Sequence, residues 1–232
     1  MGDETTDKSA SLDRRPIAAR RSRLIQRFAA WLATRRVAPN SISLLGMIAG
    51  ISSGICLAIV GRVECSDRLL FALAAILIQT RLVANLLDGL VAVEGNLKSA
   101  VGDLYNEVPD RVSDTAVFVG AGLAAGGSPA LGWAAACAAA LVAYSRVLGK
   151  SLGFDSDYRG PMAKQHRMFV MTATMVFLVL APVAWRFSIP VPAPWPTIGP
   201  IEMALFIVVV GAVVTALRRL SALARKLKGR AV

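Results

Sequence analysis

The sequence has very few of the residues that soft metal sites and nucleophilic triads require. Its 232 residues include one histidine and three cysteines, and no two cysteines form a CxxC pair. His166 therefore has no second histidine or cysteine for a metal site and no serine partner for a triad, so we assign it no catalytic role. Cys56 and Cys137 lie in apolar runs, where a free cysteine behaves as a small hydrophobic residue.

Acidic residues are also scarce, with 15 Asp and Glu against 26 Lys and Arg, which gives a formal charge of +11. The chain is 55% hydrophobic, and a soluble domain of this length is seldom so apolar. Basic flanks around apolar runs indicate an integral membrane protein held against an anionic leaflet. Nucleic-acid binding is the other interpretation of a basic chain, but a membrane interior leaves little soluble surface for it. The flanking bases are Lys8, Arg14, Arg15, Arg20, Arg21, Arg23, Arg27, Arg35 and Arg36 at the front and Arg218, Arg219, Arg225, Lys226, Lys228 and Arg230 at the end.

The apolar runs predict an all-α integral membrane protein with six transmembrane helices. Each run approaches the roughly 20 residues that a hydrocarbon core of about 30 Å requires. The predicted spans are 41–60, 69–93, 99–125, 130–152, 168–185 and 201–217. Asn40 or Ser41 is the predicted N-cap of the first span. Six spans form one domain over 38–217, followed by a basic cytoplasmic tail over 218–232.

The region before the first span divides into two parts. Residues 1–15 are polar and charged, and we expect them to be disordered. Residues 16–37 alternate bases with apolar residues, which predicts an amphipathic helix lying in the membrane interface; a solvated basic tail is the alternative. We expect no cleavable signal peptide, because the first long apolar run follows about forty polar or basic residues.

The distribution of bases also predicts the orientation. The termini and the loops after the second and fourth spans hold nearly all Lys and Arg, whereas the opposite loops hold only Arg62, Arg68 and Arg186. The positive-inside rule therefore places both termini on the cytoplasmic side of the inner membrane.

Polar residues interrupt the second and third spans at helical spacing. Asn85 and Asp88 are three residues apart, and Gly102, Asn106 and Asp110 follow at steps of four, so each set lies on one side of its helix. An ionisable group at membrane depth costs roughly 2.5–3.5 kcal/mol or more, so such a cluster indicates a functional site.

The pattern Asn85-x-x-Asp88-Gly89-x-x-Ala92, followed by Gly102-x-x-x-Asn106-x-x-x-Asp110, resembles the signature of the CDP-alcohol phosphotransferases. That signature reads DxxDGxxAR and then GxxxDxxxD. Members of the family are six-span membrane enzymes that make phospholipids from CDP-activated precursors. Pro39-Asn40-Ser41 and the Tyr144-x-Arg146 pair resemble further stretches of the same family.

The resemblance implies transfer of a phosphatidyl group from CDP-diacylglycerol to an alcohol, with release of CMP, by a homodimer that uses Mg²⁺ or Mn²⁺. Hard cations of this kind prefer oxygen ligands. Asp110 is implied as the general base. The implied ligands and contacts are Asp88, Asp110, Asn85 and Asn106 for the metal, Asp88, Gly89, Ala92 and Gly102 for the nucleotide, and Arg146, Arg159, Lys164 and Arg167 for phosphate of the acceptor or the nucleotide. Close helix packing is the alternative for Gly89 and Ala92, and ordinary positive-inside flanking is the alternative for Lys164 and Arg167.

Three departures from the signature put a two-metal site in doubt. Asn85 and Asn106 stand where the family has aspartate, which halves the formal charge of the ligands, and Val93 replaces an arginine. Arg81 or Lys98 is a possible substitute for that arginine. Glu107 or Asp103, on an acidic stripe that includes Asp110, is a possible compensating acid, although both could equally lie in solvent.

Two other functions fit the same residues. A non-catalytic relative would bind a CDP-linked lipid without turning it over. A small transporter would line a pathway with the polar cluster, but the sequence lacks the expected pair of interrupted helices.

Overall fold

The computed structural model describes residues 22–97, 99–190 and 197–230, and the regular elements in these ranges are helices. One isolated antiparallel bridge joins Ile189 to Ile198. The helices are α2 (Arg23–Thr34), α3 (Pro39–Ala58), α4 (Asp67–Glu94), α5 (Gly102–Leu123), α6 (Pro129–Ser151), α7 (Lys164–Leu180), the short 3₁₀ turn η2 (Val183–Trp185) and α8 (Pro200–Lys228).

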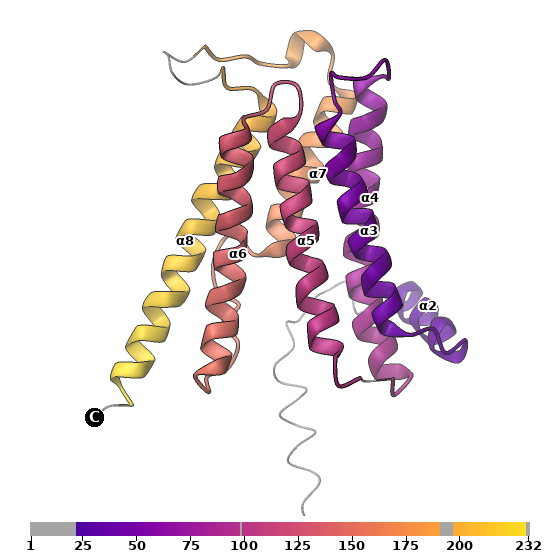
Figure 1. Cartoon of the computed structure of the whole chain (residues 1–232), viewed down its shortest axis with the longest axis vertical. Coiled ribbons are helices and arrows are strands. Elements are labelled where there is room, and N and C mark those ends of the chain that lie inside the picture. Colours follow the sequence, from indigo (N-terminus) through magenta and orange to yellow (C-terminus); the bar gives the residue numbers. More distant parts are fainter. Residues whose placement is uncertain (1–21, 98, 191–196, 231–232) are drawn as a thin grey trace, which may run out of the picture.

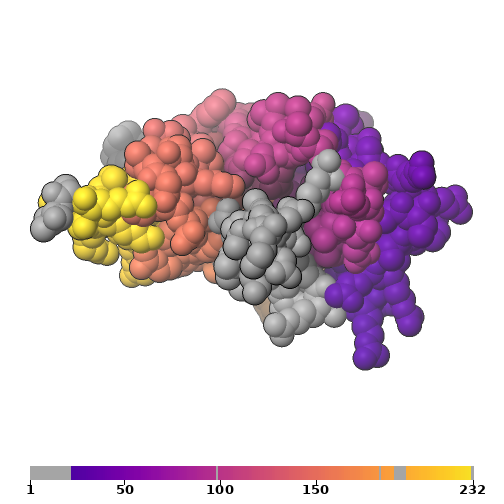
Figure 2. Space-filling view, turned by 90° about the horizontal axis from the view of Figure 1, so that it is seen from below, coloured from indigo at the N-terminus to yellow at the C-terminus, as the bar shows by residue number. Residues whose placement is uncertain are grey.

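Helices α3 to α8 form a bundle that runs along the long axis of the molecule, and α2 lies across one end of it (Figure 1). Helix α3 packs against α4 and α5, α6 packs against α5 and α8, and α7 packs against α4 and α8. The end of α8 returns to the same end of the bundle as α2. Seen from that end, the segments after α4 and α6 and the last turns of α8 form one face (Figure 2).

Four helices of the described ranges are long and apolar enough to cross a membrane, namely α3, α4, α6 and α8. Helix α7 has only 17 residues, and α5 carries several charged residues in its first half. The chain is therefore an all-helical, multi-pass membrane protein. Six crossings, with α5 and α7 included, stay a prediction.

Several predicted helix ends differ from the observed ones. Helix α3 begins at Pro39 with Ala38 in the N-cap position and no side-chain cap, so the predicted caps Asn40 and Ser41 are wrong. A proline suits the first turn because its missing N–H would have no helical partner there. Helix α7 begins at Lys164, four residues before the predicted span. This earlier start places Lys164 and Arg167 on a helix rather than in a loop.

The two ends of the chain are described only in part. Helix α2 begins at Arg23, so the predicted tail over 1–15 and residues 16–21 lie outside the described residues. Leu24, Phe28 and Trp31 on α2 are exposed, which agrees with an amphipathic surface helix. At the other end, α8 continues to Lys228, so most bases of the predicted tail lie on its last turns.

Small residues bring α3 and α5 into close contact. A Cβ atom built on Gly120 would lie 2.1 Å from the carbonyl oxygen of Gly54, and one on Gly54 would lie 2.3 Å from the carbonyl oxygen of Ala116. One turn earlier, a Cβ on Gly50 would lie 2.5 Å from the Cβ of Ser113. Close backbone approach through small residues is the usual way in which membrane helices associate. It holds α5 against α3, which in turn packs against α4.

Candidate active site

The polar residues of the predicted motif converge between α4, α5 and α7. Helical spacing aligns them on facing sides, because residues three or four apart lie one above the other. Helix α3 adds one hydroxyl to the group. The site consists of Ser43 on α3, Arg81, Asn85 and Asp88 on α4, Asn106, Asp110 and Asp114 on α5, and Lys164 and Arg167 on α7.

Lys164 makes the central contact of the site. Its Nζ lies 2.5 Å from Oδ1 and 2.6 Å from Oδ2 of Asp110, and it donates a third hydrogen bond of 2.6 Å to Oδ1 of Asn85. Nδ2 of Asn85 donates to Oδ1 of Asn106 and to Oδ1 of Asp110, both at 3.3 Å. One ammonium group therefore ties together both oxygens of the predicted base and the amide oxygen of a predicted metal ligand.

A buried ionic triad lies one helical turn beyond Asp110. Asp114 forms an ion pair with Arg81, whose Nη2 lies 2.6 Å from Oδ1, and accepts a hydrogen bond of 2.7 Å from Nη2 of Arg167 at Oδ2. Arg81 also reaches Asp110, at 3.3 Å from Oδ1 and 3.1 Å from the carbonyl oxygen. Arg81 and Arg167 are 1% exposed and Asp114 is 2% exposed, so each charge depends on these partners.

Asp88 lies apart from these cations. Its Oδ2 accepts a 2.6 Å hydrogen bond from the hydroxyl of Ser43, which also reaches the carbonyl oxygen of Pro39 at 3.2 Å. Among the described residues, no cation forms an ion pair with Asp88. A buried carboxylate that has no paired cation retains the capacity to hold one.

The formal charges of the site cancel. Three carboxylates, on Asp88, Asp110 and Asp114, face three cations from Arg81, Lys164 and Arg167. The family signature would place four aspartates on α4 and α5. The chain thus carries fewer acids on these helices and supplies part of the positive charge from its own side chains.

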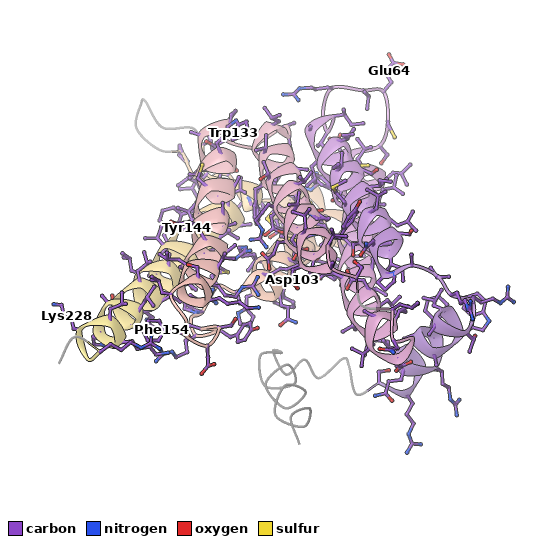
Figure 3. The ribbon with its side chains drawn as sticks, turned by 60° about the horizontal axis from the view of Figure 1, so that its bottom comes forward. Glu64, Asp103, Trp133, Tyr144, Phe154 and Lys228 are labelled. Atoms are coloured by element: carbon purple, nitrogen blue, oxygen red, sulfur yellow. The ribbon has the colours of Figure 1, made fainter. Side chains whose placement is uncertain are left out.

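Glu107 and Asp103, the possible compensating acids, have different surroundings. Glu107 forms a short ion pair with Arg146 and lies 3.8 Å from Nη2 of Arg111, which is also 3.7 Å from Asp110. Asp103 is exposed at the start of α5 (Figure 3). Arg146 therefore has the partner that a cation near the end of a span requires. That partner is Glu107, so Arg146 does not lie in the Asp110 cluster.

The loop before α7 is fixed by backbone contacts. Arg219 of α8 donates to the carbonyl oxygens of Arg159 and Val142, and the amide of Met162 donates to Oγ1 of Thr215 at 3.0 Å. Gly160 has a φ of +123°, and a Cβ there would lie 2.4 Å from Cγ2 of Thr215. Glycine is therefore required at this turn.

Arg159, predicted to bind phosphate, lies in the same loop and pairs with Asp157 at 2.8 Å. Its side chain is 66% exposed, which leaves it open to solvent. The hydrogen bond from Arg159 lowers the pKa of Asp157, although partial burial of the carboxyl opposes this shift.

The predicted nucleotide contacts are accessible to different degrees. Gly89 and Ala92 are half-buried on α4, and a Cβ on Gly102 would meet only Oγ of Ser99, at an ordinary 3.7 Å. Arg81, one of the two possible substitutes for the arginine lost at Val93, is in the site. The other, Lys98, lies outside the described residues.

Most oxygens of the predicted metal ligands already have a partner within the site. No group of three or more His, Cys, Asp or Glu side chains in the described ranges is arranged to hold a metal ion. Both oxygens of Asp110 and the amide oxygen of Asn85 face Lys164. Asp88 accepts the hydrogen bond of the Ser43 hydroxyl and pairs with no cation among the described residues, so it is the carboxylate that remains for a cation.

Sequence reasoning did not identify two members of this arrangement. Ser43 had no signal in the motif, since it lies on a helix that was read only as an apolar span. Arg219 was read as one base among many in a tail, although its side chain is buried between α6 and the loop before α7. Asp114 continues the acidic stripe of Asp103, Glu107 and Asp110, but its two arginine partners become apparent only in the structure.

Comparison with known proteins supports the pattern. A phosphatidylinositol phosphate synthase of Streptomyces avermitilis is 31% identical over 211 residues, which cover 88% of this chain and 80% of the relative. An inner membrane protein of Escherichia coli, YnbA, is 25% identical over 140 residues, which cover 60% of this chain and 67% of the relative. No protein-family model matches the chain.

Solved structures show the same fold. A phosphatidylinositol phosphate synthase of Mycobacterium tuberculosis with CDP-DAG bound has a TM-score of 0.65 at 17% identity, over 87% of this chain and 94% of that chain. The same enzyme in complex with manganese and citrate has a TM-score of 0.66 at 17% identity, over 86% and 88%. With its motif, its helical bundle and the relative from Streptomyces, the chain belongs to the CDP-alcohol phosphotransferase family.

Proposed function

We propose that the chain transfers a phosphatidyl group from CDP-diacylglycerol to an alcohol and releases CMP. The observation that carries the proposal is the convergence of Asn85, Asp88, Asn106 and Asp110 between α4 and α5, at the spacing of the family signature. Buried carboxylates and cations together suit the binding of a pyrophosphate and the removal of a proton from an alcohol.

In the proposed reaction, the hydroxyl oxygen of the acceptor forms a bond to the phosphorus nearest the lipid, and the bond from that phosphorus to the bridging oxygen breaks. The electron pair leaves on CMP. Asp110 accepts the proton of the hydroxyl, and Lys164, 2.5 Å away, holds this carboxylate in place. Asp88, oriented by Ser43, would hold a divalent cation, Mg²⁺ or Mn²⁺. When bound, such a cation supplies positive charge for the phosphate oxygens.

We further propose that the acceptor is a phosphorylated polyol such as inositol phosphate. The Streptomyces relative, named as a phosphatidylinositol phosphate synthase, supports this class. So does the exposed guanidinium of Arg159, on a loop that α8 holds in place beside α7. A phosphate group favours such a cation, whereas serine or a simple alcohol would gain little from it.

The proposed site faces the cytoplasm, with both termini on that side, and the chain is expected to act as a homodimer. The exposed apolar face of α2 and the bases on α2 and the last turns of α8 support this orientation. A water-soluble nucleotide and acceptor would reach the site from there, while the acyl chains stay in the bilayer.

The test is CMP release from CDP-diacylglycerol by the purified full chain, with Mg²⁺ or Mn²⁺ and a panel of inositol phosphate, glycerol phosphate, inositol and serine. We expect release that depends on metal and rises most with inositol phosphate. Asp110→Asn should abolish it, whereas the exposed Asp103→Asn on the same helix should leave it unchanged. Equal rates in the two variants would contradict the assignment of Asp110 as the base.

One observation favours a second candidate, a non-catalytic relative that binds a CDP-linked lipid. Both oxygens of Asp110 are engaged by Lys164, an arrangement that would also suit a site that no longer removes a proton. That candidate predicts binding of the nucleotide lipid without CMP release under any metal or acceptor.

A further inference from the structure

We propose that the ammonium group of Lys164 takes the place of a divalent cation, so that this chain binds one metal ion where a four-aspartate motif has the ligands for two. The inference rests on the proposed function for its meaning in catalysis, and on the contacts of Lys164 for its geometry. It assigns Lys164 to the metal half of the site rather than to the phosphate of the acceptor.

The first argument is the set of oxygens around the ammonium. A cation held beside Asp110 would have the oxygens of Asp110, Asn85 and Asn106 as its available ligands. Nζ of Lys164 lies 2.5–2.6 Å from both oxygens of Asp110 and from the amide oxygen of Asn85. An ammonium group has three donors, and these contacts use all of them. A metal ion could reach these oxygens only by displacing Lys164.

The second argument is charge. A change from aspartate to asparagine at positions 85 and 106 removes two negative charges, which matches the charge of one divalent cation. The negative charge of the three carboxylates that remain in the site is balanced by Lys164 and the two buried arginines. A divalent ion beside Asp110 would stand next to Lys164 and Arg81 in a site with little solvent, where repulsion between like charges is strong.

The third argument is that Lys164 is held in position. It is the first residue of α7, directly after Ala163, and the amide of Met162 is bound to Thr215. On the helix itself, Arg167 donates to the carbonyl oxygen of Met162 at 3.1 Å and pairs with Asp114 at 2.7 Å. Contacts on both sides thus anchor the backbone from which Lys164 extends, so its position beside Asp110 is built into the fold.

The test counts metal ions directly. Mn²⁺ is titrated into the purified full chain in a non-ionic detergent, without substrate, and free Mn²⁺ is followed by electron paramagnetic resonance. We expect one Mn²⁺ per wild-type chain. Lys164→Met should bind one more ion, or bind Mn²⁺ about tenfold more tightly, because Asp110 is released from the ammonium. Lys164→Arg should behave as the wild type, and the exposed Lys228→Met is the matched control.

Two Mn²⁺ ions on the wild-type chain would overturn the proposal, whether or not Lys164→Met folds. Equal counts and affinities for wild type and Lys164→Met would also overturn it. If Lys164 bound the phosphate of the acceptor instead, Lys164→Met would raise the KM for that acceptor and leave the Mn²⁺ count unchanged. Because the count needs no turnover, a chain that binds one Mn²⁺ but releases no CMP would contradict the proposed function alone.

Discussion

Asp114 offers the sharpest test of the buried ionic triad. The substitution Asp114→Asn keeps the shape of the side chain and removes its charge, which leaves the guanidinium groups of Arg81 and Arg167 without the acid that they share. Arg81 keeps a second carboxylate at 3.3 Å, on Asp110, whereas Arg167 keeps only the carbonyl oxygen of Met162. Loss of one partner of a buried ion pair costs roughly 3–5 kcal/mol, because the remaining charge stays desolvated.

For a chain of this length, each kcal/mol lowers the midpoint of thermal unfolding by about 2–4 °C, so we expect a decrease of about 6–20 °C. Unfolding of a membrane protein in detergent is often irreversible, so the midpoints are compared at one scan rate by fluorescence-detected size exclusion. The exposed Asp103→Asn is the control, with an expected change within about 0.5 kcal/mol. A midpoint for Asp114→Asn within that range of the control would refute the triad as a stabilising element.

Three further predictions concern single contacts. Ser43→Ala should reduce CMP release about tenfold or more, because Asp88 loses a charged hydrogen bond of about 1.5–3 kcal/mol; Ser43→Thr should recover part of it in the same assay. Gly120→Ala should lower the thermal midpoint, since the added Cβ meets the carbonyl of Gly54 and overpacking costs about 1–3 kcal/mol, whereas Gly149→Ala, with open space around it, should not. Glu107→Gln should retain wild-type affinity for Mn²⁺, because this acid pairs with Arg146 and Arg111; a large loss of affinity would place it at the metal.

The helices could be predicted because apolar length and turn residues determine them locally. The tight turn over Gly126 and Gly127 and the start of α6 at Pro129 follow from residues at the turn itself. The start of α3 could not be predicted from its capping residues, because proline at the first helical position competes with Asn40 and Ser41. The length of α8 could not be predicted from hydropathy either, since the helix continues through basic turns beyond the apolar run.

The composition of the site was predictable to the extent that helical spacing controls it. Steps of three and four placed Asn85, Asp88, Asn106 and Asp110 on facing sides of two helices, and the structure brings the two sides together. Which cation would meet which acid depends on how α7 packs, and no spacing rule in the sequence gives that. Lys164 and Arg167 are both predicted to bind phosphate, with positive-inside flanking as the alternative, yet one lies on Asp110 and the other on Asp114.

The asparagines at positions 85 and 106 and the lysine at position 164 make physical sense only together. Restoring aspartate at positions 85 and 106 with Lys164 in place would add two negative charges to a site that is already neutral, and Asn85 would lose the Nδ2 donor that reaches Asp110. Removal of Lys164 alone would leave Asp110 with Arg81, at 3.3 Å, as its nearest cation. Either change alone leaves buried charge unpaired, at a cost of several kcal/mol, whereas both together would re-create a ligand set that needs metal for its stability. In thermal unfolding, the wild-type chain should therefore lose less stability when a chelator removes metal than the variant with both aspartates and without Lys164.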